Sequence, residues 1–417
     1  MKIIKNLVKK YIAPSLSLII IAAISWSCEK PNPELGLKSG VWRGELTAQG
    51  NQIPFNFEVS KEDGSYHIKL VNGVEKLDID RIDILDDSLF FDMHIFDISI
   101  KAKIYKDSLV GSYTKNYADN YVLPFKAIYG KEGRFDRTES SNLFDGTWET
   151  TFKDKDGKES SAIGIFKVED KMLRGTFLTK TGDYRYLDGY TSKDTMYLYT
   201  FDGNHIFKFR AYKENDSLLK GEYWSGKTSY KTFESIKNDT VTLPDANSLT
   251  YLKEGYDQID FSFPDLDGKM TSLKDEKYKD KIVILQIFGT WCPNCMDETR
   301  FLSDWYHKNQ AQGIEIIGLA YEIKPEFEYA RDRVLTMKEK LDVPYDFLIA
   351  GTSSTKSASE SLPMLNKVMS FPTSIIIDRK GKVRRIHTGF SGPATGVYYE
   401  EFVDDFNQFM QELINES

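Results

Sequence analysis

An unbroken apolar run that ends at a pair of cysteines limits the fold of this sequence more than any other feature. Residues 281–290 read KIVILQIFGT, which is typical of a parallel strand buried on both faces. Residues 295–310 read CMDETRFLSDWYHKNQ and show helical spacing, with large apolar side chains on one side. Cys292 and Cys295 lie where this strand passes into this helix. The sequence therefore predicts an α/β arrangement around the two cysteines.

The same alternation continues toward the C-terminus. A second apolar run occupies residues 313–322, and helical spacing follows over residues 324–341. Residues 370–390 contain two strand patterns joined by the turn DRKG, which indicates a hairpin, and residues 399–414 form an amphipathic helical pattern. Strands that alternate with helices and end in a hairpin predict an α/β domain with a mixed sheet over residues 245–417.

The preceding region contains strand patterns broken by turn residues and lacks convincing helical spacing. It also repeats itself, because SGVWRGEL around Trp42 is matched by FDGTWETTF around Trp148. We therefore predict two antiparallel β units, residues 39–131 and residues 144–240, each a small barrel or sandwich. The expected protein is multidomain, with this all-β region in front of the α/β domain.

Two short segments of the β region carry separate expectations. Residues 131–143, KEGRFDRTESSNL, join the two units and are polar enough to be expected at the surface. Residues 181–190, TGDYRYLDGY, alternate aromatic with polar residues, and we favour a strand with half-buried tyrosines over a ligand-binding face. The region contains no Ser/His/Asp set, metal-ligand spacing or phosphate loop, so it is expected to be a scaffold or a recognition module.

The N-terminus has the organisation of an export signal. Residues 1–27 begin with a basic stretch and continue with an apolar region of 14 residues, which is too short to span a bilayer comfortably. The segment ends at Cys28 and resembles a bacterial lipoprotein signal, in which the cysteine becomes the lipidated first residue. Ser25 stands where such signals usually carry Leu, and ordinary secretion with an incidental Cys28 is the alternative. Residues 28–38 would then form a linker.

Charge excludes one class of partner. The formal net charge is −8, and no long basic tract occurs. Phosphate backbones are bound by clustered Lys and Arg, so we expect no nucleic-acid partner.

Three chemistries are open to Cys292 and Cys295: a metal site, a structural disulfide or a redox pair. Structural zinc needs four ligands, and the five histidines are scattered, so no second ligand pair is present. A disulfide across two intervening residues closes almost no loop and would add little stability. At a helix N-terminus, by contrast, backbone N–H groups stabilise a thiolate on Cys292, and Pro293 suits the first turn. The pair is therefore interpreted as redox-active, with Cys292 attacking and the more buried Cys295 resolving the mixed disulfide.

With SFPTSIIIDRKG downstream of IVILQIFGTWCPNC, residues 245–417 resemble the thioredoxin superfamily. The leading FSFPDLDGKMTSLKD resembles its TlpA-like branch of membrane-anchored thiol–disulfide oxidoreductases, and GFSGPATGVYYEEF resembles the Bacteroidota lipoproteins of that branch. The resemblance implies a thioredoxin-like fold, a cis peptide bond at Pro372, and no cofactor besides the Cys292–Cys295 disulfide. It also implies that substrate is contacted by Trp291, Pro293, Asn294, Phe371 and Thr373.

One position departs from the resemblance. Thioredoxin carries a buried Asp in the strand before its cysteines, and this chain has Gln286 there, which cannot titrate. Glu298 is therefore the candidate for proton transfer at Cys295, with a solvated helix residue as its other interpretation. Trp291 is interpreted as a shield over the site or as simple packing.

These observations predict an envelope-facing enzyme that reduces or exchanges disulfides in exported proteins. It would be a lipoprotein anchored to a bacterial membrane, face the periplasm and receive electrons from a membrane donor. A thiol peroxidase of the peroxiredoxin type is an alternative, although LQIFGTW before Cys292 lacks the proline of that motif. A third possibility is a binding module in which the β units carry the main function.

Overall fold

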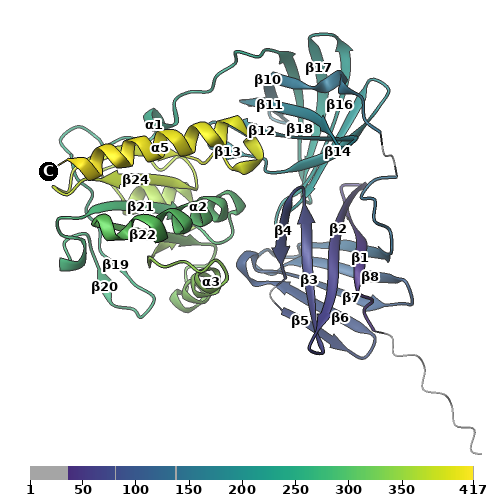
Figure 1. The fold of residues 1–417 in the computed structure, drawn as a ribbon, viewed down its shortest axis with the longest axis horizontal. Coiled ribbons are helices and arrows are strands. Elements are labelled where there is room, and N and C mark those ends of the chain that lie inside the picture. The colour runs from purple at the N-terminus through teal and green to yellow at the C-terminus, as the bar shows by residue number, and fades with distance from the viewer. Residues whose placement is uncertain (1–35, 80, 137–138, 417) are drawn as a thin grey trace, which may run out of the picture. The chain divides into compact units, whose positions relative to one another are not determined.

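The computed structural model describes residues 36–79, 81–136 and 139–416 (Figure 1). The expected signal peptide, Cys28 and most of the linker after it lie outside the described residues. Two β units and a C-terminal α/β domain follow one another along the chain, which confirms the expected fold class.

The first β unit is one antiparallel sheet of nine strands in the order β4-β3-β2-β1-β9-β8-β7-β6-β5. Its strands are β1 Gly40–Ala48, β2 Asn51–Glu62, β3 Ser65–Asn72, β4 Glu75–Asp78, β5 Arg81–Leu85, β6 Ser88–Met93, β7 Ile98–Ile104, β8 Ser108–Lys115 and β9 Val122–Tyr129. Strands β4 and β5 are the two ends of the sheet, so it does not close into a barrel. Met296 from the C-terminal domain belongs to the same core as Trp42, Phe55 and Phe57. The open sheet therefore completes its core with a side chain of another domain.

The second β unit is a closed barrel. Its order is β11-β10-β18-β17-β16-β15-β14-β12-β13, and an additional pairing of β11 with β12 joins the ends of the ring. Its strands are β10 Gly146–Asp154, β11 Glu159–Glu169, β12 Met172–Thr179, β13 Gly182–Asp183, β14 Leu187–Ser192, β15 Thr195–Phe201, β16 Ile206–Asn215, β17 Leu218–Ser225 and β18 Ser229–Lys237. Closure removes the exposed sheet edges that the first unit retains.

The two β units repeat each other in detail. In each unit the first strand pairs with both the second and the last strand. The indole Nε1 of Trp42 donates to the carbonyl of Lys38, and that of Trp148 donates to the carbonyl of Phe144, in both cases four residues earlier. The sequence repeat around the two tryptophans therefore corresponds to one repeated structural unit.

The segment between the β units is not simply exposed, and that expectation was wrong for two residues. Arg134 is buried, and its guanidinium donates to Asp188 at 3.1 Å and to the carbonyl of Pro54 at 2.9 Å. Phe135 packs against Tyr199 with ring centroids 5.4 Å apart. A buried ion pair with further hydrogen bonds compensates for the desolvation of Arg134, and the polar composition of the segment gave no sign of it.

The C-terminal domain has a mixed five-stranded sheet in the order β23-β22-β21-β24-β25. Its strands are β21 Ile282–Phe288, β22 Ile314–Glu322, β23 Asp346–Thr352, β24 Thr373–Ile377 and β25 Val383–Thr388, and a small ribbon of β19 Phe263–Pro264 and β20 Met270–Thr271 precedes them. The helices are α1 Ala246–Leu249, α2 Pro293–Asn309, α3 Phe327–Lys340, α4 Thr355–Ser361 and α5 Val397–Asn415. Short 3-10 helices lie at His94–Phe96, Asn142–Phe144, Glu276–Tyr278, Gln310–Gln312 and Pro393–Thr395.

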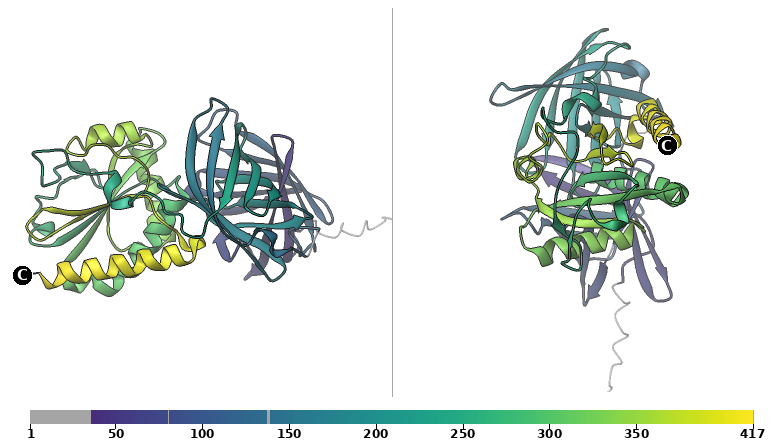
Figure 2. Two further views of the ribbon diagram at one scale, coloured as in Figure 1. Left: turned by 90° about the horizontal axis from the view of Figure 1, so that it is seen from above. Right: turned by 90° about the vertical axis from the view of Figure 1, so that its left-hand side faces the viewer.

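Alternation along β21 assigns its side chains to two cores. Ile282, Ile284 and Phe288 belong to a core with α2, α3 and α5, whereas the odd-numbered residues belong to a core with α4. Phe301 of α2 and Phe406 of α5 have ring centroids 5.1 Å apart, so these helices pack together on the first face (Figure 2). Gln286 is even-numbered and therefore points toward α2. Among the helices of the described residues, none is both long and apolar enough to cross a membrane.

Candidate active site

Cys292 is the N-cap of α2, directly after the loop that leaves β21. It forms a disulfide with Cys295, and its Sγ also accepts a hydrogen bond from the backbone N–H of Cys295 at 3.2 Å. Pro293 occupies the first helical position, where a missing N–H has no consequence. Cys292 is 7% exposed and Cys295 is 1% exposed, so Cys292 is the more accessible sulfur.

A loop from the other side of the sheet meets the disulfide. The peptide bond between Phe371 and Pro372 is cis, as expected, and the carbonyl oxygen of Phe371 lies 3.7 Å from Cys292 Sγ. Thr373 departs from the expectation of substrate contact. Its side chain is fully buried, its hydroxyl donates to the carbonyl of Ser370 at 2.9 Å, and it is not part of the lining of the cavity that contains Cys292.

Trp291 and the loop before Cys292 are fixed by buried partners. The indole Nε1 of Trp291 donates to the carbonyl of Tyr321 at 2.8 Å, and its ring packs edge-on against Phe371. The carboxylate of Glu322 accepts from both the N–H and the hydroxyl of Thr290, each at 2.8 Å. Burial raises the pKa of Glu322 to about 7. Sequence analysis missed this residue because it lies at the end of a different strand.

Behind the disulfide, Glu298 and Gln286 form one buried polar cluster. Glu298 accepts hydrogen bonds from Ser374 Oγ at 2.8 Å and from Gln286 Nε2 at 2.9 Å. Gln286 Nε2 also lies 3.4 Å from the carbonyl oxygen of Cys295. Burial raises the pKa of Glu298 to about 7. The interpretation of Glu298 as a solvated helix residue was therefore wrong.

The second β unit covers the helical side of the cysteine motif. Asn294 Nδ2 donates to the carbonyl of Asp183 at 3.1 Å, and Arg185 Nη1 donates to the carbonyl of Pro293 at 2.8 Å. Both Arg185 and Asp183 belong to residues 181–190, where we favoured a strand with half-buried tyrosines. The tyrosines are half-buried as predicted, but the segment forms two strands with a break between them rather than one, and it contacts the cysteine motif.

Arg185 also connects three carboxylates from different parts of the chain. Its guanidinium pairs with Asp297 of α2, with Glu75 of β4 at 2.5 Å and with Asp202 at 3.1 Å. Arg185 is 1% exposed, so these charges compensate for the burial of the cation. Burial raises the pKa of Asp297 to about 6.

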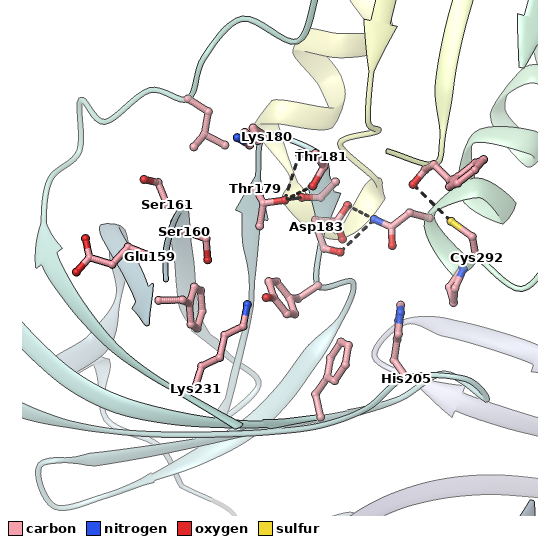
Figure 3. Close-up of a pocket in the computed structure, with 18 of the residues that line it drawn as sticks. Glu159, Ser160, Ser161, Thr179, Lys180, Thr181, Asp183, His205, Lys231 and Cys292 are labelled. Carbon is pink, nitrogen blue, oxygen red and sulfur yellow. Dashed lines mark hydrogen bonds between the residues drawn. The ribbon is translucent and has the colours of Figure 1, made fainter. Parts of the chain in front are cut away.

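A second loop of the barrel lies beside Trp291. Asn204 Nδ2 donates to the carbonyl of Trp291 at 2.8 Å. The next residue, His205, is oriented by Asp202, whose Oδ2 lies 2.9 Å from His205 Nδ1. Figure 3 shows the His205 ring pointing toward the Cys292 side of the cavity.

These elements enclose a cavity of about 830 Å³ with Cys292 in its wall (Figure 3). The C-terminal domain contributes Trp291, Cys292, Pro293, Asn294 and Phe371, and barrel residues form most of the remaining wall. The predicted substrate-contacting residues, apart from Thr373, therefore share one cavity, and much of its lining comes from outside the C-terminal domain.

Comparison with known proteins shows which families and structures this chain is similar to. Residues 255–386 match the AhpC/TSA family model. Thiol-disulfide oxidoreductase ResA of Geobacillus thermodenitrificans is 29% identical over 130 residues, which cover 31% of this chain and 66% of the relative. Thioredoxin-like protein YneN of Bacillus subtilis is 28% identical over 138 residues, covering 33% of this chain and 73% of the relative. A crystal structure of a thiol:disulfide interchange protein of the thioredoxin family from Chlorobium tepidum TLS covers 39% of this chain and 99% of its own, with 20% identity and a TM-score of 0.30.

The C-terminal domain is thioredoxin-like, and its similarity to thiol–disulfide oxidoreductases is confined to this part of the chain. The family match ends before α5 and does not include either β unit. Arg185, Asp183, Asn204 and His205 are therefore additions to a thioredoxin-like site, and they come from the barrel. The sequence offered one signal for them, the aromatic and polar alternation of residues 181–190, which did not indicate what the segment contacts.

Proposed function

We propose that this protein is a thiol–disulfide oxidoreductase that uses Cys292 and Cys295 to reduce or exchange disulfides in exported proteins. One observation carries the proposal. The Cys292–Cys295 disulfide lies at the N-terminus of α2, with the more accessible Cys292 in the wall of a cavity and beside the Phe371 carbonyl. An accessible sulfur at a helix N-terminus is the arrangement that favours a nucleophilic thiolate.

In the reducing direction, the Cys292 thiolate attacks one sulfur of the substrate disulfide and displaces the other as a thiolate. Cys295 then attacks Cys292 Sγ, which releases the second substrate thiol and forms the intramolecular disulfide. Two electrons pass from the protein dithiol to the substrate, and the two dithiol protons end on the two product thiols. A separate reductant must then restore the dithiol.

The backbone around the disulfide is suited to this sequence. The N–H of Cys295 already donates to Cys292 Sγ at 3.2 Å and would stabilise a thiolate there. The backbone of Phe371 lies beside the same sulfur and could pair with an extended substrate segment.

Glu298 is the proposed proton carrier for Cys295. It is buried, its pKa is raised to about 7 by burial, and Gln286 links it to the backbone of Cys295. A carboxyl group that titrates near neutral pH can both accept and return a proton under working conditions.

The cellular setting rests on residues 1–28 alone, which resemble a lipoprotein signal. We propose that Cys28 is lipidated, that the protein faces the periplasm and that a membrane donor supplies electrons. Incorporation of a fatty-acid analogue into the wild-type protein, but not into Cys28→Ala, would support the anchor, and equal labelling would contradict it.

The central test is the reduction potential of the Cys292–Cys295 pair in glutathione or dithiothreitol buffers. Reduction potentials of catalytic cysteine pairs run from about −270 mV for reductants to about −120 mV for oxidants, so the value also gives the direction. A pair that cannot be cycled between dithiol and disulfide would refute the proposed function.

The AhpC/TSA match keeps peroxide as a second substrate to test. We expect Cys295→Ser to accumulate a mixed disulfide with a protein substrate and Cys292→Ser to form none. Rapid peroxide consumption with a thiol donor, without reduction of protein disulfides, would favour the peroxidase instead.

A further inference from the structure

Cys292 lies in the wall of a cavity to which the barrel contributes most of the lining. Pro293 and Asn294, the residues between the two cysteines, are buried and hydrogen-bonded to the barrel through Arg185 and Asp183. Cys292 itself is 7% exposed and lines the cavity. We therefore expect a substrate disulfide to reach the sulfur through this cavity.

The size of the cavity restricts what can enter. Its volume of about 830 Å³ falls within the range of about 300–1,000 Å³ that is usual for small-ligand sites. A short extended segment or a small disulfide fits such a space, whereas the surface of a folded domain does not.

The walls combine aromatic rings with cationic groups. Phe152, Tyr184 and Phe207 of the barrel contribute rings, opposite Trp291 and Phe371. Apolar walls with a few well-placed polar groups are typical of sites that bind the apolar part of a ligand and recognise its charged groups.

Three lysines of the barrel give the cavity its charge. Lys158, Lys180 and Lys231 line it, and within the described part of the chain none of them forms an ion pair with a carboxylate. Figure 3 shows Lys231 extending from β18 into the cavity, and its ammonium lies 6.0 Å from the centre of the Phe152 ring.

The carboxylates of the lining are already engaged. Asp183 accepts hydrogen bonds from the N–H groups of Arg185 at 2.6 Å and Gly392 at 2.8 Å. Glu159 pairs with Lys153, which is outside the lining, at 3.7 Å. These hydrogen bonds leave the charge of Asp183 in place, but the three lysines still outnumber Asp183 and Glu159 in the lining, so its formal charge is positive.

We propose that this cavity is a recognition site for anionic, peptide-sized disulfides, in which the barrel lysines bind carboxylates that flank the disulfide. This inference rests on the proposed function and names its substrate class. The electron balance is the one given above: the dithiol becomes the Cys292–Cys295 disulfide, and one anionic disulfide becomes two thiols. When the barrel lysines bind the carboxylates near the substrate disulfide, they would place one of its sulfur atoms beside Cys292 Sγ.

The test measures the rate at which three small disulfides oxidise the Cys292–Cys295 dithiol of the full chain, after reduction with dithiothreitol and its removal. Oxidised glutathione is anionic, bis(2-hydroxyethyl) disulfide is neutral and cystamine is cationic. Dividing each rate by that of free dithiothreitol with the same disulfide removes differences in intrinsic reactivity. We expect the normalised rate for the anionic probe to exceed that for the cationic probe by about tenfold at low ionic strength. The preference should largely vanish at 1 M salt, where the screening length is about 3 Å.

Variants then assign the preference to the cavity. Lys158→Gln, Lys180→Gln and Lys231→Gln should each lower the rate with oxidised glutathione by about twofold to fivefold and leave the neutral probe unchanged. Lys167→Gln removes the same charge from an exposed position of the barrel outside the lining and should change neither rate.

Equal normalised rates for the three probes, or a preference that survives all three substitutions, would overturn the inference while the proposed function stands. Failure to reduce any of the three probes would instead contradict the proposed function. A second experiment measures the same rate with short peptides that carry the disulfide between glutamates or between glutamines. A faster reaction of the glutamate peptide than of oxidised glutathione assigns the site to protein segments, and the reverse order assigns it to small disulfides.

Discussion

The buried carboxyl group of Glu298 can be tested through its titration. Its side chain is 1% exposed, and both of its hydrogen-bond partners, Ser374 and Gln286, are neutral. Two neutral donors do not replace the hydration that a carboxylate loses on burial, so the protonated form is favoured and the pKa rises from 4.5 to about 7.

The raised pKa of Glu298 makes the folded protein less stable as the pH rises. The folded protein holds this proton more tightly than the unfolded chain, so the stabilisation is fully present below pH 4.5 and is lost as the pH rises through 7. The difference between the two pKa values, 4.5 and about 7, corresponds to about 3 kcal/mol of folding stability in total. Glu298→Gln cannot titrate and should abolish this pH dependence. Its amide also meets the Gln286 amide as a second donor, which lowers stability by an amount that does not depend on pH.

Urea denaturation of the oxidised protein, at intervals from pH 5 to pH 8, measures the effect. The free energy of unfolding of the wild type should fall by about 2–3 kcal/mol relative to Glu298→Gln across this range. Taking the difference at each pH removes contributions from other groups, including Glu322. Glu339→Gln, at an exposed position of α3, is the matched control and should parallel the wild type. A difference between wild type and Glu298→Gln that stays constant would mean that Glu298 ionises as it does in water, and the reasoning from burial would be refuted.

Three further changes test packing between and within the domains, each by the same denaturation assay. Arg185→Met leaves the carboxylates of Asp297 and Asp202 without their buried cation, and we expect a loss of about 3–5 kcal/mol; a loss below about 1 kcal/mol would show that water reaches the cluster. Met296→Ala removes a side chain from the core of the first sheet and should cost about 2–5 kcal/mol, with an unchanged stability arguing against that contact. Gly111→Ala places a Cβ 1.9 Å from the carbonyl oxygen of Lys101, so we expect a loss of about 1–3 kcal/mol, and wild-type stability would show that β7 and β8 separate more freely than they do here.

The parts of the site that are local in sequence could be predicted from the sequence. The strand of residues 282–288 and the helix that begins at Pro293 follow from one apolar run and one helical pattern, so the positions of Cys292 and Cys295 followed as well. The cis peptide bond at Pro372 was predicted from the resemblance of SFPTSIIIDRKG to the thioredoxin superfamily. Gln286 could be placed behind the cysteines because thioredoxin carries its buried Asp at the same place in the preceding strand.

The parts of the site that depend on contacts between distant segments could not be predicted from the sequence. Arg185 lies 112 residues before Asp297, and nothing in either local pattern indicates that a turn of the barrel meets α2. Arg134 was misjudged for the same reason, because its partner Asp188 is 54 residues away. Composition predicts whether a charged residue is normally exposed, but a buried ion pair is a property of two segments at once.

Three positions near the start of α2 show how the β units contribute to the surroundings of the cysteine pair. Asn294 contacts Asp183 of the barrel, Met296 enters the core of the first sheet, and Asp297 pairs with Arg185. All three positions lie within the first two turns of the helix that carries Cys295. In a thioredoxin-like domain standing alone, a helix surface with these residues would expose a methionine and leave Asp297 in water, where its carboxyl would lose the burial that raises its pKa to about 6. The β units therefore complete the surroundings of the cysteine pair, and barrel residues form most of the cavity that Cys292 lines.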